Sequence, residues 1–161
     1  MLVGTGVMAM VQVRGEIVID RRPEDVFDFV ANEEHEPRYN RQMRIAKKTT
    51  DGPIGVGTRF HAEMARRGMV VPMTVEFTEF ERPHRIAERV DMEAMNVTGG
   101  LSFEPVEGRT RMVWSWDLQP RGFLRFLGPL VGAMGRRQEQ RIWTQMKRLL
   151  EQPGDSALSS T

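Results

Sequence analysis

The feature that most constrains this chain is an alternation of apolar and polar residues that starts after Gly57 and continues to Gln119. Successive side chains of a β-strand point to opposite faces of the sheet, so this period of two predicts half-buried strands. The predicted strands are Thr58–Arg66, Val70–Phe80, Arg85–Asp91, Met95–Glu104 and Arg109–Gln119. Because the links between them are short, we expect each strand to form an antiparallel hairpin with the next.

One face of this sheet is predicted to be continuously apolar. Directly opposed residues of an antiparallel pair share a face. The apolar rows of neighbouring strands come to the same face if each hairpin loop has an even number of residues. Such loops are predicted at Arg67-Gly68, near Glu81–His84 and at Val106–Arg109. These rows are Phe60, Ala62, Met64; Met73, Val75, Phe77; Ile86, Glu88, Val90; Val97, Leu101, Phe103; and Met112, Trp114, Trp116. A slip of one residue would turn a whole row outward.

Helices are predicted on both sides of this meander. A strand at Val11–Asp20 leads into a short helix at Pro23–Ala31, whose proline suits the first turn. A second short helical piece is expected at Glu36–Gln42, and a long helix at Phe123–Glu151. The apolar stripe of the long helix comprises Leu127, Val131, Met134, Gln138, Ile142, Met146 and Leu149. The fold class is therefore α+β, with an antiparallel sheet of six to seven strands.

Length and composition exclude several classes of protein. The chain has 161 residues, with 23 basic against 22 acidic residues, no cysteine and three histidines. This near-neutral balance argues against a nucleic-acid partner, and no metal-ligand spacing is present, so we expect neither a metal nor a cofactor. No apolar run is long enough for a membrane span, and no signal peptide is evident, which predicts a cytoplasmic protein. We expect a disordered extension at residues 1–10, one domain at 11–151 and a disordered tail at 152–161.

Five segments carry a resemblance to a known family. They are Arg22–Val30, Gly52–Phe60, Glu81–Ile86, Gly108–Trp116 and Met146–Glu151. Together with the order of the predicted elements, these segments resemble the START-like superfamily, also called SRPBCC, the polyketide cyclase/dehydrase and lipid transport group. The resemblance implies a helix-grip fold, in which a curved sheet wraps around the C-terminal helix and leaves a cavity between them. It also implies that Tyr39 lies at one end of the cavity, where many relatives have tryptophan.

The resemblance implies that this cavity binds a small hydrophobic ligand, such as a lipid, a polyketide or an aromatic compound. Methionines are frequent in the inward rows, and their flexible side chains adapt to irregular apolar ligands as readily as they fill core gaps. The predicted ligand-binding residues are Tyr39, Phe60, Met64, Met73, Val75, Phe77, Ile86, Glu88, Val90, Val97, Leu101, Met112, Trp114, Trp116, Met134, Gln138 and Ile142.

Glu88 is the most informative polar residue, because it falls between Ile86 and Val90 on an apolar row. A buried carboxylate is unfavourable unless it is paired or protonated. Glu88 could therefore act as a general acid or base, anchor a ligand hydroxyl, or form a structural ion pair. Gln138 could donate a hydrogen bond to a ligand carbonyl or satisfy a buried backbone group.

Three functions remain open from the sequence. The leading interpretation is a carrier or sensor without catalysis, since no convincing catalytic pair is apparent. The second is a polyketide or aromatic cyclase or dehydratase that uses Glu88 or Tyr39 for proton transfer. The third is a module that meets an anionic membrane or a partner through the basic C-terminal helix, with Phe123–Met134 as its exposed patch. The charged run Glu33–Glu36 is interpreted as a solvated helix end.

Overall fold

A single sheet of seven antiparallel strands forms the body of the protein, in the order β1-β7-β6-β5-β4-β3-β2. The computed structural model describes residues 10–154, so the predictions for residues 1–9 and 155–161 lie outside the described part. The strands are β1 (Val11–Ile19), β2 (Met43–Lys48), β3 (Arg59–Arg66), β4 (Met69–Glu81), β5 (Arg85–Met92), β6 (Met95–Val106) and β7 (Arg109–Pro120). The helices are α1 (Pro23–Ala31), η1 (Glu33–Arg38), η2 (Gly122–Leu127) and α2 (Gly128–Leu150), of which η1 and η2 are 3₁₀-helices.

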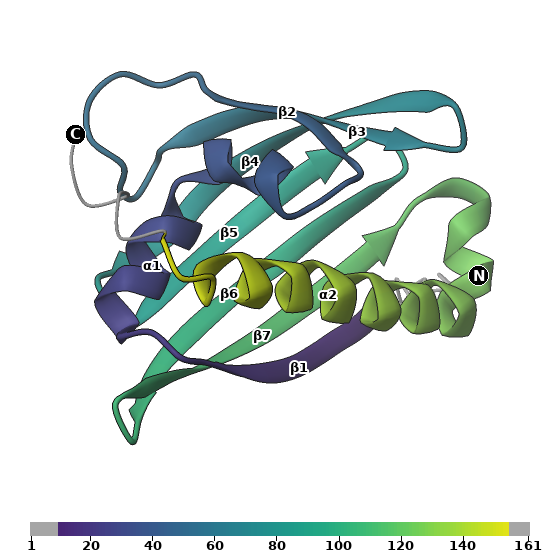
Figure 1. Ribbon diagram of the computed structural model, residues 1–161. Coiled ribbons are helices and arrows are strands. Elements are labelled where there is room, and N and C mark those ends of the chain that lie inside the picture. Colours follow the sequence, from purple (N-terminus) through teal and green to yellow (C-terminus); the bar gives the residue numbers. More distant parts are fainter. Residues whose placement is uncertain (1–9, 155–161) are drawn as a thin grey trace, which may run out of the picture.

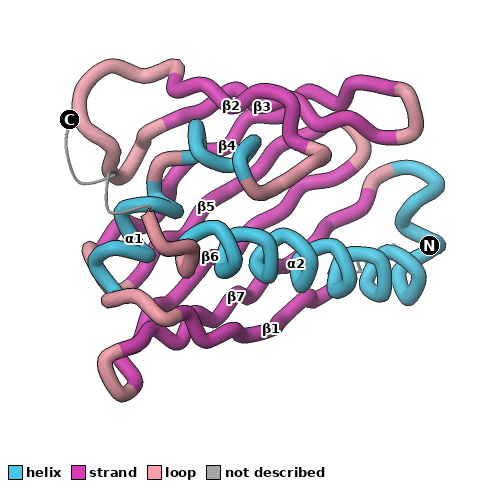
Figure 2. The backbone as a smooth tube through the Cα atoms, viewed as in Figure 1, coloured by secondary structure: helices cyan, strands magenta, loops and turns pink. Residues whose placement is uncertain are grey.

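The helices lie on one face of the sheet. The long α2 crosses the concave face, while α1 and η1 cover the end where the chain passes from β1 to β2 (Figure 1). The colouring by secondary structure shows the same two layers, with the helices in front of the sheet (Figure 2). This is the helix-grip arrangement of the α+β class, and it confirms the fold predicted from the sequence.

The predicted register is confirmed across the centre of the sheet. Val90 lies opposite both Val75 and Val97, and Leu101 lies opposite Trp114. The hairpin turns at Arg67-Gly68 and Glu107-Gly108 have positive φ at both positions, as two-residue hairpin turns require. The apolar rows therefore meet on the concave face and form the core beneath the helices.

The turn between β4 and β5 differs from the prediction. Glu81 pairs with Arg85, which leaves a three-residue turn instead of an even-numbered one. A β-bulge at Thr78 restores the register, because Phe77 lies opposite Glu88 on one side of the bulge while Glu79 pairs with Ala87 on the other. A turn with an odd number of residues would place the apolar row of β5 on the opposite face from that of β4. The extra residue at the bulge reverses this shift, so both apolar rows stay on the concave face.

Two helical predictions are corrected by the structure. The second short helix is the 3₁₀-helix η1, which begins at Glu33 instead of Glu36, and the edge strand β2 follows it as a seventh strand. The long helix is also interrupted: η2 is a separate 3₁₀ segment, and α2 begins at Gly128 with Pro129 in its first turn. Proline lacks an N–H and is favoured in the first turn of a helix, which explains the new start.

The buried face of α2 also differs from the predicted stripe. Gly132 is buried against β1, and a Cβ there would lie 2.9 Å from a Val11 methyl group. Ile142 and Met146 of the predicted stripe are buried, Trp143 outside the stripe is buried as well, and Met134 is 42% exposed. Met134 was predicted to bind ligand, and its outward position removes it from the concave face.

Candidate ligand-binding cavity

A cavity of about 190 Å³ lies between the concave face of the sheet, η1 and α2. Its apolar lining consists of Val13, Met43, Met64, Met73, Val75, Val90, Met92, Met95, Val97, Leu101, Leu118, Ile142, Trp116 and Trp143. The volume slightly exceeds the roughly 150 Å³ of an apolar cavity that holds benzene, but it is below the roughly 300–1,000 Å³ of typical ligand pockets. The cavity as it stands therefore suits a ligand with a one-ring body.

The hollow is located where a central strand lacks a side chain. Gly99 of β6 lies opposite Glu88 on β5 and Trp116 on β7, and both of these neighbours line the cavity. Gly99 has φ +142°, and a Cβ there would lie 2.0 Å from the Ser115 carbonyl oxygen. Only glycine tolerates this backbone conformation and contact, so the strand carries no side chain between Glu88 and Trp116.

The geometry of η1 directs a row of polar side chains into this space. A 3₁₀-helix has three residues per turn, so side chains three positions apart lie on the same side. Glu33 and Glu36 are three apart, and Tyr39, which caps the helix, follows three residues later. All three residues line the cavity, and the Asn40 amide donates a hydrogen bond of 2.7 Å to Glu36 Oε1.

α2 supplies the third wall through residues spaced as one helical face: Gly135, Gln138, Glu139, Ile142 and Trp143. Glu139 is held by two indole groups, because Trp116 Nε1 donates at 2.8 Å and Trp143 Nε1 at 2.9 Å to its Oε2. These donors come from the sheet and from the helix itself, so the Glu139 carboxyl links the two layers. The Gln138 amide lies 3.8 Å from Met64 Sδ.

Glu88 extends from the sheet into the same cavity. Its position between Ile86 and Val90 on the concave face agrees with the register prediction. Among the described residues, neither a hydrogen bond nor an ion pair engages its carboxyl, in contrast to Glu36 and Glu139. Glu88 therefore presents a free polar group to whatever occupies the cavity.

Burial and mutual repulsion strongly perturb these carboxyls. Burial raises the pKa of Glu88 from 4.5 to about 8, and the nearby Glu36 and Glu139 add to the shift. Burial likewise raises the pKa of Glu139 to about 7, although the two indole hydrogen bonds oppose the change. The pKa values of Glu33, Glu36 and Tyr39 also rise, mainly because of burial. Near neutral pH, the cavity can therefore hold both protonated and ionised carboxyls.

The structure places most of the predicted ligand-binding residues in the cavity lining. These are Tyr39, Met64, Met73, Val75, Glu88, Val90, Val97, Leu101, Trp116, Gln138 and Ile142. The remaining inward residues, Phe60, Phe77, Ile86, Met112 and Trp114, are buried in the core outside the cavity lining. The Phe60 and Phe77 rings pack together at 5.5 Å, and Trp114 packs behind the lining residue Trp143 at 6.2 Å. Whether the lining residues bind a ligand remains a prediction.

The sequence pattern did not indicate Glu33, Glu36, Glu139 and Trp143 as cavity residues. The interpretation of Glu33–Glu36 as a solvated helix end was wrong, because Glu33 and Glu36 face the cavity. Even His35 is partly buried, and its ring stacks on Phe29 at 4.7 Å. The spacing of Glu33, Glu36 and Tyr39 would have indicated a shared face if a 3₁₀-helix had been assumed instead of an α-helix.

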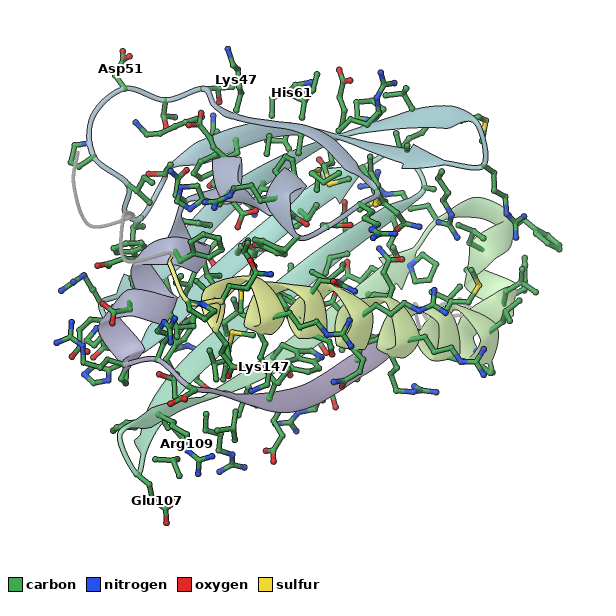
Figure 3. The ribbon with its side chains drawn as sticks, in the orientation of Figure 1. Lys47, Asp51, His61, Glu107, Arg109 and Lys147 are labelled. Atoms are coloured by element: carbon green, nitrogen blue, oxygen red, sulfur yellow. The ribbon has the colours of Figure 1, made fainter. Side chains whose placement is uncertain are left out.

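The segment η2 and the first turn of α2 present an exposed apolar patch. Phe123 is 73% exposed, Phe126 68% and Leu130 55%, and the Arg125 guanidinium lies over the Phe126 ring. One basic residue of α2, Lys147, is neutralised within the fold by its ion pair with Glu151. Lys147 lies on the side of α2 that faces β1 (Figure 3). Within residues 10–154, no helix combines the length and apolar character that a bilayer crossing needs.

Comparisons with known proteins identify relatives. Residues 10–151 match the family model described as polyketide cyclase / dehydrase and lipid transport. No curated protein matches the sequence. Among solved structures, the ZhuI aromatase/cyclase from Streptomyces sp. R1128 is similar with a TM-score of 0.78 at 13% identity, over 94% of this chain and 100% of that one. The protein TTHA0849 from Thermus thermophilus is similar with a TM-score of 0.76 at 19% identity, over 92% of this chain and 99% of that one. A START superfamily protein from Mycobacterium smegmatis is similar with a TM-score of 0.74 at 12% identity, over 87% of this chain and 97% of that one. Identities this low establish the shared fold alone.

Proposed function

Because the chain belongs to the polyketide cyclase/dehydrase and lipid transport family, we propose that it binds a small, largely apolar molecule in the cavity between the sheet and α2. The observation that supports this proposal is the cavity itself. It combines an apolar wall with a few convergent polar groups, which is the usual composition of a small-molecule site. Five methionines line it, and their flexible side chains allow a ligand somewhat larger than the resting volume.

The test combines ligand discovery with a variant that fills the cavity. Native mass spectrometry of freshly purified protein identifies co-purifying molecules, and a thermal-shift screen of aromatic compounds, polyketides and fatty acids follows. A ligand at 100 times its Kd stabilises the native state by about 2.7 kcal/mol, which is a shift of several degrees for a domain of this size.

Val97→Phe is the blocking variant, because Val97 lines the cavity. Val113→Phe is its control, since Val113 alternates with the inward Met112 and Trp114 on β7 and is also partly buried. We expect Val97→Phe to abolish the ligand-induced shift while Val113→Phe retains it. Equal shifts in both variants would place the ligand outside the cavity and contradict the proposal.

A second candidate function is acid–base catalysis on the bound molecule, as in a cyclase or dehydratase. The observation that favours it is the pair Glu88 and Glu139, which both line the cavity and whose pKa values of about 8 and about 7 lie just above and at neutrality. A carboxylate could remove a proton next to a ligand carbonyl, while a protonated carboxyl protonates the departing hydroxyl as water. Loss of water from a β-hydroxyketone substrate, followed by mass spectrometry, tests this function. Glu88→Gln should retain binding of this neutral substrate and lose turnover.

A peripheral membrane contact is also proposed for the exposed patch of Phe123, Phe126 and Leu130. Arg125 beside these side chains would favour anionic headgroups, and aromatic residues suit the membrane interface. Sedimentation with phosphatidylglycerol vesicles should be lost in the Phe123→Ser/Phe126→Ser variant, and phosphatidylcholine vesicles serve as the reference. The cytoplasmic location expected from the sequence remains a prediction.

A further inference from the structure

The polar part of the cavity is acidic and lacks an internal counter-charge. The carboxyls of Glu33 and Glu36 come from η1, that of Glu88 from β5 and that of Glu139 from α2. Arg66 is the one basic side chain among the described lining residues, and it is exposed to solvent on β3.

From this arrangement we propose that the ligand carries an organic cation, a protonated amine on a one-ring apolar body, whose ammonium group lies among these four glutamates. The proposal rests on the proposed function and specifies the ligand class.

The unpartnered Glu88 supports this proposal most directly. Glu88 is partly buried, and its carboxyl faces the cavity without a hydrogen-bond partner among the described residues. Its cross-strand neighbours are Phe77 and Gly99, neither of which offers a side-chain donor. An unsatisfied buried carboxyl is costly. An ammonium group has three N–H donors and no acceptor, and it would satisfy this carboxyl.

Glu139 provides a second, preorganised acceptor. The two indole donors engage Oε2 and so fix the orientation of the carboxyl, while no described group donates to Oε1. The Trp116 and Trp143 rings also line the cavity and offer faces that attract cations. The Tyr39 ring lies 6.2 Å from the Trp143 ring and extends this aromatic wall toward η1. Carboxylates within an aromatic wall form a typical cation-binding environment.

No basic group of the described residues stabilises the ionised form of these carboxyls. Repulsion from neighbouring carboxylates contributes to the raised pKa of Glu33, Glu88 and Glu139, and no basic residue within 10–154 lowers any of them. The pKa of Tyr39 is raised by the same neighbours, and Arg66 at the rim is the remaining titratable group of the described lining. A bound ammonium would favour the ionised carboxylates, so its binding should expel protons from the site.

A metal ion is the less favoured occupant. Among the described residues, no group of three or more His, Cys, Asp or Glu side chains is placed to hold a metal ion. The glutamates therefore do not form a metal-ligand set, whereas an ammonium group needs acceptors only at the longer hydrogen-bond distance. A neutral ligand carbonyl that accepts from protonated carboxyls is the other alternative, and the experiment separates it.

Isothermal titration calorimetry with three one-ring probes tests the proposal: 2-phenylethylamine, 2-phenylethanol and 3-phenylpropionate. At pH 7.5 we expect the amine to bind at least tenfold more tightly than the alcohol, and the carboxylate not to bind. Titration of the amine in two buffers of different ionisation enthalpy should reveal protons released on binding. Proton release is a readout that a merely structural Glu88 would not produce.

Variants assign the effect to the carboxyls. Glu88→Gln should lower amine affinity about tenfold, leave the alcohol unchanged and reduce the proton release. Glu81→Gln is the matched control, because Glu81 is an exposed glutamate of the neighbouring strand β4, and it should behave as the wild type. Circular dichroism and melting curves verify that both variants fold. An unchanged amine affinity in folded Glu88→Gln would refute the assignment.

The outcomes separate this proposal from the function on which it rests. If the alcohol or the carboxylate binds as well as the amine, and Val97→Phe blocks binding, the cavity binds ligands but the cation proposal is overturned. Calcium or zinc binding that Glu88→Gln removes, without amine binding, would also overturn it in favour of a metal. Failure of all probes and of the wider ligand screen would reject the proposed function as well.

Discussion

Replacing Glu88 by glutamine should change how the stability of the ligand-free protein depends on pH. The folded-state pKa of Glu88 is about 8, whereas its ordinary value is 4.5. Between these values the native state retains a proton that the unfolded chain has lost, so the free energy of unfolding decreases as the pH rises. The favourable contribution is complete below pH 4.5 and is lost progressively up to about pH 8.

The size of this change in stability follows from the difference between the folded-state and ordinary pKa values of Glu88. Each unit of pKa difference corresponds to about 1.36 kcal/mol, so the upper bound for Glu88 is about 5 kcal/mol. Water that enters the cavity would solvate the carboxylate and reduce this penalty. We therefore expect the stability of Glu88→Gln relative to wild type to be greater at pH 8 than at pH 5, by about 2 kcal/mol or more. The amide retains the size of the side chain but cannot ionise.

Urea denaturation at pH 5, 6, 7 and 8 measures this difference, with the fluorescence of the buried Trp114, Trp116 and Trp143 as the signal. The exposed variant Glu81→Gln should give a pH profile parallel to that of the wild type. The decisive quantity is the difference in free energy of unfolding between Glu88→Gln and wild type, compared at pH 5 and at pH 8. A difference that is constant with pH would show that Glu88 ionises in the folded protein as it does in the unfolded chain.

Three further substitutions test the packing around the site. Trp143→Phe removes a hydrogen-bond donor to Glu139, and we expect the free energy of unfolding in urea to fall by about 1–2 kcal/mol at pH 8. The loss should be smaller at pH 5, where the carboxyl is protonated, and equal losses at both pH values would contradict the role of this hydrogen bond. Gly99→Ala should reduce the free energy of unfolding by about 2 kcal/mol or more, because the new Cβ would lie 2.0 Å from a carbonyl oxygen. The control Gly57→Ala, which has positive φ but no atom within 4 Å of the new Cβ, should reduce the free energy of unfolding by a smaller amount. Thr110→Val should lower the melting temperature through a loss of about 1 kcal/mol, since the buried hydroxyl donates at 2.7 Å to the Arg21 carbonyl, and an unchanged melting curve would refute this.

The sequence by itself determined the strands, the concave apolar face and the place of Glu88 on it. These features depend on local alternation and on short turns, which restrict the register before any tertiary contact forms. Val90 opposite Val75 and Val97 is an example of a pairing that could be worked out residue by residue. The odd turn before Arg85 was the exception, because the compensating bulge at Thr78 leaves no clear mark in the alternation.

Only the tertiary structure decided which residues form the cavity. Glu33 and Glu36 looked like a solvated charge run, and the pattern of the basic C-terminal helix did not indicate Glu139. The 3₁₀ winding of η1 and the close approach of α2 to β1 at Gly132 turn these carboxyls inward. Such burial depends on how separate elements pack against one another, and the pattern within a single element carries no information about it.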